Sequence, residues 1–178
     1  VPCAINKSDW FLPLPNGSEI WMGGIDDKER TEKILGKEFA TILLNECSQI
    51  PYNSRNLIVT RLAQKCEYEV NGMRRQLALK LYYDQNPPSK SHWAYQLFYL
   101  HRDPDSKQPM RDAEVAQYAQ LSINPRDNLA NLPTDYIDSL EKLPARLKRR
   151  FLLGEYVDTA PDALWTEEII ERWRVSPS

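Results

Sequence analysis

The stretch ATILLNECSQI, Ala40 to Ile50, decides the fold of this chain. An uncharged run, Ala40 to Leu44, is followed directly by Asn45 and Glu46 and then by further polar residues. A short apolar run of this kind is typical of a strand that is buried in a parallel sheet. Open α/β sheets bind their ligands outside the carboxyl ends of the strands. The stretch therefore predicts a parallel strand that presents the carboxylate of Glu46 to a ligand.

The loop that would hold a bound phosphate is missing from the sequence. An acid at the end of a buried strand is a means of polarising the water that attacks the γ-phosphate of ATP. ATP-hydrolysing enzymes of this kind also need a glycine-rich loop of the pattern GxxxxGK[ST], and the sequence does not contain it. The chain also begins at Val1 rather than at Met, within a segment that we expect to be ordered. We therefore expect the chain to be a fragment of a longer protein.

Composition limits the class of protein. With 178 residues, of which 42% are hydrophobic and 27% charged, the chain has the size and composition of one globular domain. A net charge of −2 gives no electrostatic reason for the whole surface to bind nucleic acid, although local basic patches remain possible. Three cysteines without a CxxC pair predict a reducing, cytoplasmic environment and no structural zinc site. The sequence has neither an apolar run of membrane-spanning length nor a signal peptide, so we expect no membrane association.

The rest of the chain predicts strands that alternate with helices, and hence an α/β fold with a largely parallel sheet. Asn16-Gly17 is a tight-turn signal, and Leu77, Leu79 and Leu81 alternate with polar or small residues as in a strand. The expected elements are a hairpin over 12–25, a helix over 26–36, the strand ending at Glu46, a helix from Pro51, a strand over 74–83, an aromatic-rich helix capped by Ser91, a strand over 118–123, helices opened by Pro133 and Pro144, and a short helix from Thr166.

Four blocks of sequence are informative as an ordered set. They are LPNGSEIWMGGIDD (14–27), GKEFATILLNECSQI (36–50), YYDQNPPSKSHW (82–93) and RRFLLGEYVDTAPDALWTEEII (149–170). Together they resemble the large terminase subunit of tailed bacteriophages, the motor protein that packages DNA. By this resemblance the second block is the Walker B strand with its catalytic glutamate, and the third couples hydrolysis to movement. The fourth marks the passage from the ATPase half to the nuclease half.

The resemblance implies an incomplete P-loop NTPase-like fold of the RecA/ASCE type, with a mostly parallel sheet flanked by helices. Residues 1–154 would form the later part of the ATPase domain, and residues 155–178 a linker or subdomain leading toward an RNase H-like nuclease domain outside the chain. ATP and Mg²⁺ would be the cofactors. Double-stranded DNA, the portal protein and the small terminase subunit would be the partners of a ring of identical subunits, which would work in the bacterial cytoplasm and transiently at the procapsid portal. Without a phosphate loop, the chain alone is expected neither to bind ATP tightly nor to hydrolyse it.

The resemblance also assigns roles to individual residues. Glu46 is the expected catalytic residue, which orients or deprotonates the attacking water. Asn45 stands where an acid is usual, so its amide could orient a water of the Mg²⁺ shell but adds no charge. Asn86 and Gln85, after the second predicted strand, would sense the γ-phosphate and transmit the change to the next helix. Two plainer alternatives stay open, because Glu46 could cap a neighbouring helix and Asn86 could form an Asx-turn before a proline.

Basic residues form two further groups. The first lies near the end of a predicted helix, where it could contact the DNA backbone or form a solvated face, and we favour the solvated face. Some relatives carry a trans-acting arginine where this chain has Leu35, so a neighbouring basic residue could replace it, or the arginine could come from elsewhere. The first group comprises Arg146, Lys148, Arg149 and Arg150, and the second comprises Arg30, Lys33 and Lys37.

Other reactive side chains have structural interpretations. We expect Cys47 to be a buried, small apolar side chain. We expect His92 and His101 to pack on helices or the surface, because no Cys or paired acid nearby completes a metal site. A competing interpretation of the whole chain is a non-catalytic, prophage-derived interaction module with a degenerate ATPase fold. A phosphate loop encoded upstream of Val1 would favour the motor, and its absence from the complete gene would favour the module.

Overall fold

The computed structural model describes residues 6–25, 34–158 and 172–173. The chain divides into two compact units, residues 1–43 with 53–82 and residues 44–52 with 83–178. The predicted helix over 26–36 is described only from residue 34 onward, and the predicted helix from Thr166 lies outside the described residues. Among the described helices, none combines the length and the apolar character that crossing a bilayer requires.

The first unit begins with the predicted hairpin. Strands β1 (Phe11–Pro13) and β2 (Glu19–Trp21) pair in antiparallel fashion, with Phe11 opposite Trp21. The rings of this pair stack with their centroids 4.6 Å apart. In the turn, Asn16 Oδ1 accepts a hydrogen bond from the backbone of Ser18 at 3.1 Å, and Gly17 takes φ 84°. The prediction of a hairpin from Asn16-Gly17 is confirmed.

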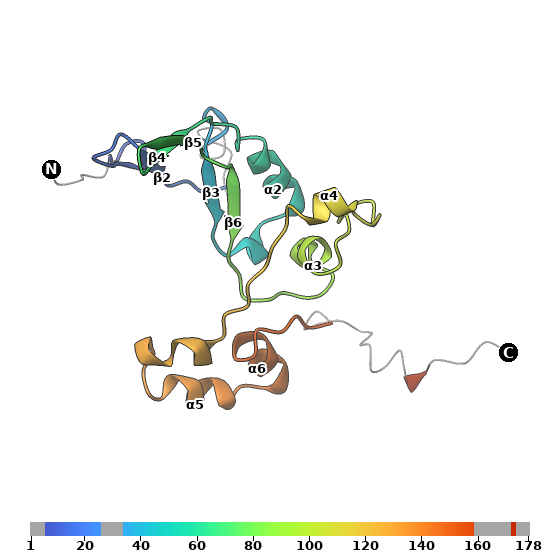
Figure 1. The fold of residues 1–178 in the computed structure, drawn as a ribbon. Helices are drawn as coiled ribbons and strands as arrows, with labels where there is room; N and C mark the ends of the chain where they lie inside the picture. The colour runs from blue at the N-terminus through green and yellow to red at the C-terminus, as the bar shows by residue number, and fades with distance from the viewer. Residues whose placement is uncertain (1–5, 26–33, 159–171, 174–178) are drawn as a thin grey trace. The chain divides into compact units, whose positions relative to one another are not determined.

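The decisive stretch forms strand β3 (Thr41–Leu44), which pairs with β6 (Lys80–Tyr83) (Figure 1). Lys80 N–H donates to the carbonyl of Ala40, and Asp84 N–H donates to that of Leu44, each at 3.2 Å. Both strands advance by the same number of residues between these bonds, so they run parallel. The predicted parallel strand is confirmed, and it ends at Leu44, two residues before Glu46.

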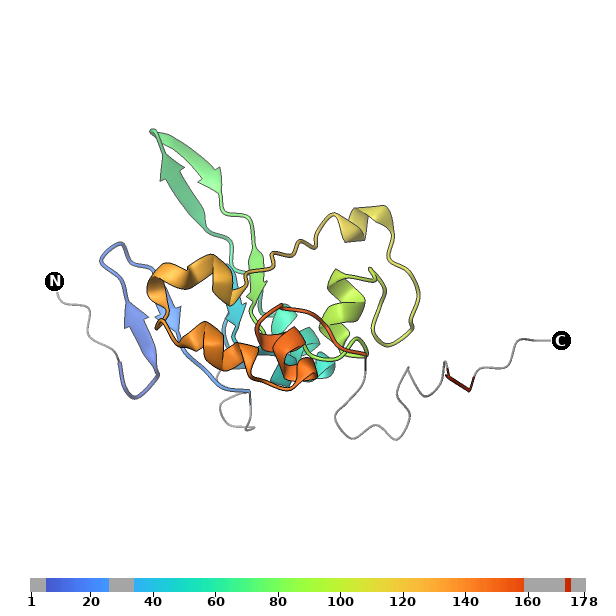
Figure 2. The same ribbon diagram turned by 90° about the horizontal axis from the view of Figure 1, so that it is seen from below.

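A second hairpin interrupts the region predicted as one strand. Strand β4 (Glu67–Val70) pairs with β5 (Met73–Gln76) in antiparallel fashion, and every residue of both strands is exposed. The turn residues Asn71 and Gly72 have φ of 52° and 73°, as a tight primed turn requires. Figure 2 shows the hairpin extending away from β3 and β6. The single strand predicted over 74–83 is therefore wrong, because its first part pairs with β4 and its last part with β3.

Helix α2 (Tyr52–Val59) follows Pro51, as predicted. Ile58 is its buried residue. Beyond the helix, the Arg61 guanidinium donates to the carbonyl of Leu35 at 2.7 Å, and the Arg61 carbonyl accepts from the backbone of Phe39 at 2.8 Å. These bonds fasten the segment after α2 to the segment that leads into β3.

The second unit is built around helix α3 (Trp93–Phe98), whose buried residues include Trp93, Ala94 and Leu97. Tyr83 meets the rings of Trp93 and Phe98 edge-on, with centroid distances of 5.7 and 5.4 Å. The N-cap is His92, whose Nδ1 accepts from Ala94 N–H at 3.2 Å.

Ser91 was the predicted cap of α3, and this prediction is wrong by one residue. Its hydroxyl instead forms a hydrogen bond with that of Ser89 at 2.7 Å. The imidazole of His92 is positioned for capping by its own packing on Trp93, with ring centroids 5.2 Å apart.

The helices that the structure describes after α3 are short. The strand predicted over 118–123 is wrong, because this segment is extended but pairs with no strand in the described part of the chain, and it leaves Leu121 and Ile123 exposed. Apolar alternation cannot make a strand without a ladder partner. The helices are α4 (Asp112–Val115), the 3₁₀ segment η2 (Pro125–Asn131), α5 (Tyr136–Glu141) and α6 (Ala145–Phe151).

The two predicted helices are confirmed as α5 and α6, although Pro133 and Pro144 precede them rather than lie in their first turns. The Pro133 carbonyl accepts from Tyr136 N–H at 3.0 Å, and Pro144 is the N-cap of α6. Gly154 ends α6 with φ 64°, where a Cβ atom would lie 2.7 Å from Asn124 Oδ1. Beyond it, Val157 forms a parallel bridge with Ser89, so the segment after α6 lies beside the loop before α3.

Replacing Gly154 with Ala should destabilise the chain more than the same change at Gly17. Both glycines have positive φ, but a Cβ atom at Gly17 would meet nothing within 4 Å. Gly17→Ala should therefore cost only the backbone strain, about 1–2 kcal/mol. Gly154→Ala should cost about 0.5–1.5 kcal/mol more, because the end of the Asn124 side chain must leave its rotamer to make room for the methyl group. Urea unfolding monitored by tryptophan fluorescence measures both, and equal costs would contradict the close approach to Asn124.

Candidate functional site

Glu46 adopts an uncommon backbone conformation directly after β3. It precedes the 3₁₀ helix η1 (Cys47–Gln49), and its φ of 52° and ψ of 47° are left-handed. This conformation costs a non-glycine residue about 1–2 kcal/mol, and such residues cluster at functional sites. The left-handed turn lets η1 begin at once, so the chain turns sharply at the carboxyl end of the strand.

The carboxylate of Glu46 takes no part in the polar contacts of the described residues. The side chain is half-buried and does not cap η1. Within the described part of the chain it makes no hydrogen bond or ion pair. The helix-capping alternative is therefore not what the structure shows. The neighbouring Asn45 is exposed to solvent.

Asp84, directly after β6, contacts the Glu46 turn through three hydrogen bonds. Its Oδ1 accepts from Glu46 N–H at 3.0 Å. Its carbonyl accepts from Cys47 N–H at 2.9 Å, and its own N–H donates to Leu44 as the last bond of the parallel pair. Asp84 thus provides hydrogen-bond partners for the Leu44 carbonyl and for the N–H groups of Glu46 and Cys47.

Gln85 lies in a part-buried polar chain that begins at Cys47. The Cys47 thiol donates to Gln85 Oε1 at 3.3 Å, and Gln85 Nε2 donates to the hydroxyl of Tyr156 at 2.5 Å. The amide therefore already has partners at both ends. Asn86 is exposed, and the residue of this loop that contacts Glu46 is Asp84 rather than Asn86.

Two other tyrosines hold Tyr156 in place. The ring of Tyr156 lies 4.9 Å from those of Tyr95 and Tyr99, which stack on each other at 5.1 Å. Burial raises the pKa of the Tyr156 phenol, with smaller contributions from the neighbouring Tyr99 and Cys47. Tyr156 therefore stays protonated and serves as the acceptor for Gln85. The segment after α6 is joined in this way to α3 and to the loop after β6.

Burial also determines the chemistry of Cys47, which is 1% exposed. Desolvation, followed by the negative charges of Asp84 and Glu46, raises the pKa of its thiol from 9.0 to about 12. A thiol of this kind is not a nucleophile at neutral pH. The predicted buried, apolar character of Cys47 is confirmed.

The predicted basic group near α6 is largely occupied by internal contacts. Lys148 pairs with Glu141, which also binds Arg126 at 2.5 Å. Arg149 Nε lies 2.7 Å from Glu155, and the Arg150 guanidinium lies 5.1 Å from the ring of Phe151. Arg146 is half-buried. Ion pairs within the chain reduce the charge that this group offers to DNA.

Of the second basic group, only Lys37 is described, and Arg30 and Lys33 lie outside the described residues. The Lys37 ammonium lies 3.7 Å from the centroid of the Trp21 ring, in a cation–π contact. It therefore belongs to the packing of the first hairpin.

Histidines and acids do not assemble a metal site in the described part of the chain, where no cluster of three or more His, Cys, Asp or Glu side chains has suitable geometry. Burial lowers the pKa of His92, as expected of a capping, ring-packed imidazole. Glu46 and Asp84 supply two carboxylates and Asn45 an amide at one sheet edge. Mg²⁺ in proteins often keeps several waters and binds through one or two carboxylates, and this edge of the sheet supplies two.

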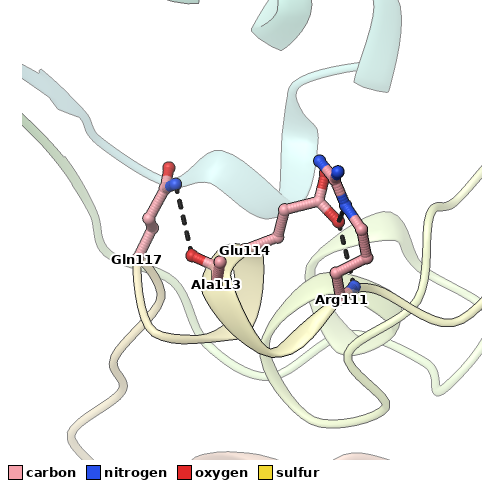
Figure 3. A network of polar contacts seen from close by, with 4 residues as sticks. All are labelled: Arg111, Ala113, Glu114 and Gln117. Atoms are coloured by element: carbon pink, nitrogen blue, oxygen red, sulfur yellow. Dashed lines mark hydrogen bonds and ion pairs between the residues drawn. The ribbon is translucent and has the colours of Figure 1, made fainter.

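A separate groove of about 410 Å³ lies beside α4. Figure 3 shows its main charges paired with each other, because the Arg111 guanidinium binds both Glu114 carboxylate oxygens, at 3.0 and 3.2 Å. The nearby Gln117 amide donates to the carbonyl of Ala113 at 3.4 Å. The hydrogen bonds from Arg111 lower the pKa of Glu114. The groove therefore presents this ion pair together with the carboxylate of Asp103, which accepts hydrogen bonds from Asp105 and Ser106.

Comparison with known proteins identifies the family. The sequence profile described as "Phage terminase large subunit" matches residues 2–153. The chain belongs to the phage terminase large subunit family. Comparison with curated proteins gives no match.

The structure is similar to a solved large terminase from a thermophilic bacteriophage, with a TM-score of 0.64 and 20% sequence identity. The similarity covers 88% of this chain and 34% of that terminase, so the chain spans about a third of its length. The predicted incomplete α/β fold of the terminase type is confirmed.

Two residues of this terminase site were not found from the sequence. In the sequence, Asp84 is simply the residue that follows a predicted strand. The parallel pairing of β6 with β3 brings it to Glu46. Tyr156 lies in the block that resembles the family, but its partner Gln85 is distant in sequence. Asp84 could have been found, because an acid stands shortly after each of the two paired strands. No local sequence feature indicated the role of Tyr156.

Tyr156→Phe should destabilise this terminase chain by about 1–3 kcal/mol, because Gln85 Nε2 loses its acceptor in a part-buried site. Tyr99→Phe is the matched control, since the Tyr99 hydroxyl makes no hydrogen bond in the described part of the chain. It should change stability by less than about 0.5 kcal/mol. Chemical denaturation measures both, and equal effects would count against the hydrogen bond.

Cys47 should resist a thiol reagent such as DTNB at pH 8 in the folded chain, whereas the half-buried Cys66 reacts. Peptide mapping by mass spectrometry separates the two sites, and urea should make Cys47 reactive. Because the pKa of Cys47 is higher in the folded chain than its ordinary 9.0, its ionisation favours unfolding only as the pH rises above about 9. Native labelling of Cys47 at the rate of Cys66 would contradict its burial.

Proposed function

We propose that this chain supplies the water-activating part of an ATP-driven motor that packages double-stranded DNA into phage capsids. The observation that carries the proposal is the left-handed turn at Glu46, which follows a parallel strand and whose carboxylate makes no hydrogen bond or ion pair within the described part of the chain. Family membership supports the same role. In this proposal, residues 1–154 belong to the ATPase domain, and residues 155–178 lead toward a nuclease domain.

Glu46 would act on the attacking water. A carboxylate without an internal partner can accept a hydrogen bond from that water and take its proton as the bond to phosphorus forms. Asn45 would orient a water of the metal shell through its amide. Mg²⁺, when bound with ATP, would neutralise charge on the phosphates. The residues that cradle the phosphates are not in this sequence, so the chain by itself should neither bind ATP tightly nor hydrolyse it.

Transmission of the hydrolysis signal would run through the loop after β6. Gln85 joins Cys47, beside Glu46, to Tyr156 on the segment after α6. A shift of the Glu46 turn would therefore move Gln85 and, through it, Tyr156 and the tyrosine rings of α3 and its C-cap that pack on Tyr156. In this scheme Asn86, which is exposed, would sense the γ-phosphate, whereas Gln85 would carry the mechanical link. DNA, the portal protein and the small terminase subunit would be the partners of a ring of such subunits.

A non-catalytic interaction module is the second candidate. The observation in its favour is Asn45, an exposed amide that gives a metal ion no charge. The coding sequence upstream of Val1 separates the candidates. A strand followed by GxxxxGK[ST] supports the motor, and a complete gene without it supports the module.

In the full-length large subunit, Glu46→Gln should lower the kcat of ATP hydrolysis by about 10²–10⁴-fold with little change in ATP binding, because only the proton acceptor is lost. Glu38→Gln, at an exposed position before the same strand, is the matched control and should leave kcat unchanged. Steady-state phosphate release and nucleotide binding measure the two effects. Full activity of Glu46→Gln would contradict the proposed role of Glu46. Measurable ATP hydrolysis by the isolated chain would contradict the proposal that it needs phosphate-binding residues from outside this sequence.

A further inference from the structure

The Glu46 turn needs a restraint that its own residue type does not provide. An L-residue with φ 52° and ψ 47° is less stable than in the right-handed or extended regions by about 1–2 kcal/mol. Asn and Asp tolerate this region through local hydrogen bonds, whereas Glu has no such advantage. Hydrogen bonds must therefore hold Glu46 in this conformation: its carbonyl accepts from Gln49 N–H at 2.9 Å within η1, and its own N–H donates to Asp84.

The hydrogen bonds of Asp84 divide into two kinds. Its backbone N–H and carbonyl bind Leu44 and Cys47, which any residue at this position other than proline could do. Its carboxylate binds Glu46 N–H at 3.0 Å, which requires a side-chain acceptor of short reach. A bond to a charged acceptor is stronger than one to a neutral acceptor. The side chain of Asp84 is thus the specific restraint on the left-handed residue.

We infer that Asp84 is a positioning residue, whose carboxylate holds Glu46 in the left-handed turn and so directs the Glu46 carboxylate. The conformational part of this inference stands on the geometry alone. Its consequence for hydrolysis rests on the proposed function. Parallel pairing explains the assignment, because Asp84 directly follows β6 and its own N–H makes the last bond of the pair, to Leu44.

The first experiment measures the turn in the chain itself. In Asp84→Ala, NMR chemical shifts should show residue 46 leaving the left-handed region, and its amide hydrogen should exchange at least about 10-fold faster. The Phe39 amide, which binds Arg61, is the internal control and should be unchanged. Asp84→Asn keeps an acceptor oxygen and should retain the turn. A left-handed residue 46 with unchanged exchange in Asp84→Ala would overturn the inference.

A second variant removes the need for the restraint. Glycine adopts φ near +50° without strain, so Glu46→Gly should keep the turn even when combined with Asp84→Ala. If Asp84→Ala alone does not fold, recovery of folding by the added Glu46→Gly supports the inference, and failure to recover contradicts it. This arm requires no enzymatic activity.

The catalytic consequence is tested in the full-length large subunit. Asp84→Ala should lower kcat for ATP hydrolysis by about 10-fold or more with little change in KM, and Asp84→Asn should restore most of it. If Glu46→Gln leaves hydrolysis intact, the proposed function fails while the NMR result still decides the role of Asp84. If Glu46→Gln abolishes hydrolysis but Asp84→Ala does not reduce it, the positioning role fails by itself.

Discussion

The parallel pairing of β3 with β6 is the constraint on which the candidate site depends. Two strands that run in the same direction end at the same edge, so the residues that follow them meet. Glu46 follows one strand and Asp84 the other, and the hydrogen bond between them forms only in this register. A shift of one residue would turn the side chain of Leu44 from the interior to solvent. Core burial and the geometry of the site are therefore set by the same register.

Part-buried contacts beyond this edge join segments that are far apart in sequence. A polar chain joins Cys47, Gln85 and Tyr156. Burying such polar groups costs little free energy as long as each one keeps its hydrogen-bond partner. The surrounding tyrosine rings partly shield the hydroxyl of Tyr156 from solvent. Such a chain tolerates little rearrangement, because moving one member leaves a neighbour without a partner. This rigidity would suit the transmission proposed for the loop after β6.

Sequence reasoning succeeded where local chemistry decides structure and failed where pairing does. The apolar run before Asn45, the Asn16-Gly17 turn and the prolines before α5 and α6 act through their own backbone, and those predictions are confirmed. The strand over 74–83 failed because alternation looks the same in one strand as in two strands with different partners. Asp84 was missed for a related reason, since its role exists only in the paired state. The roles of Glu46, Asn45, Asn86 and Gln85, the basic residues and the domain boundary at residue 154 stay predictions.

The hairpin of β4 and β5 has a consequence for how this family can vary. Leu77 N–H donates to the carbonyl of Cys66 at 2.8 Å, so the hairpin closes at its base. Its residues are all exposed, and its length does not influence where β6 begins. Insertions at Asn71-Gly72 would therefore lengthen an external arm without moving the sheet edge. The arm can therefore vary in sequence and length independently of the Glu46 turn, and a reporter sequence can be inserted at the same place.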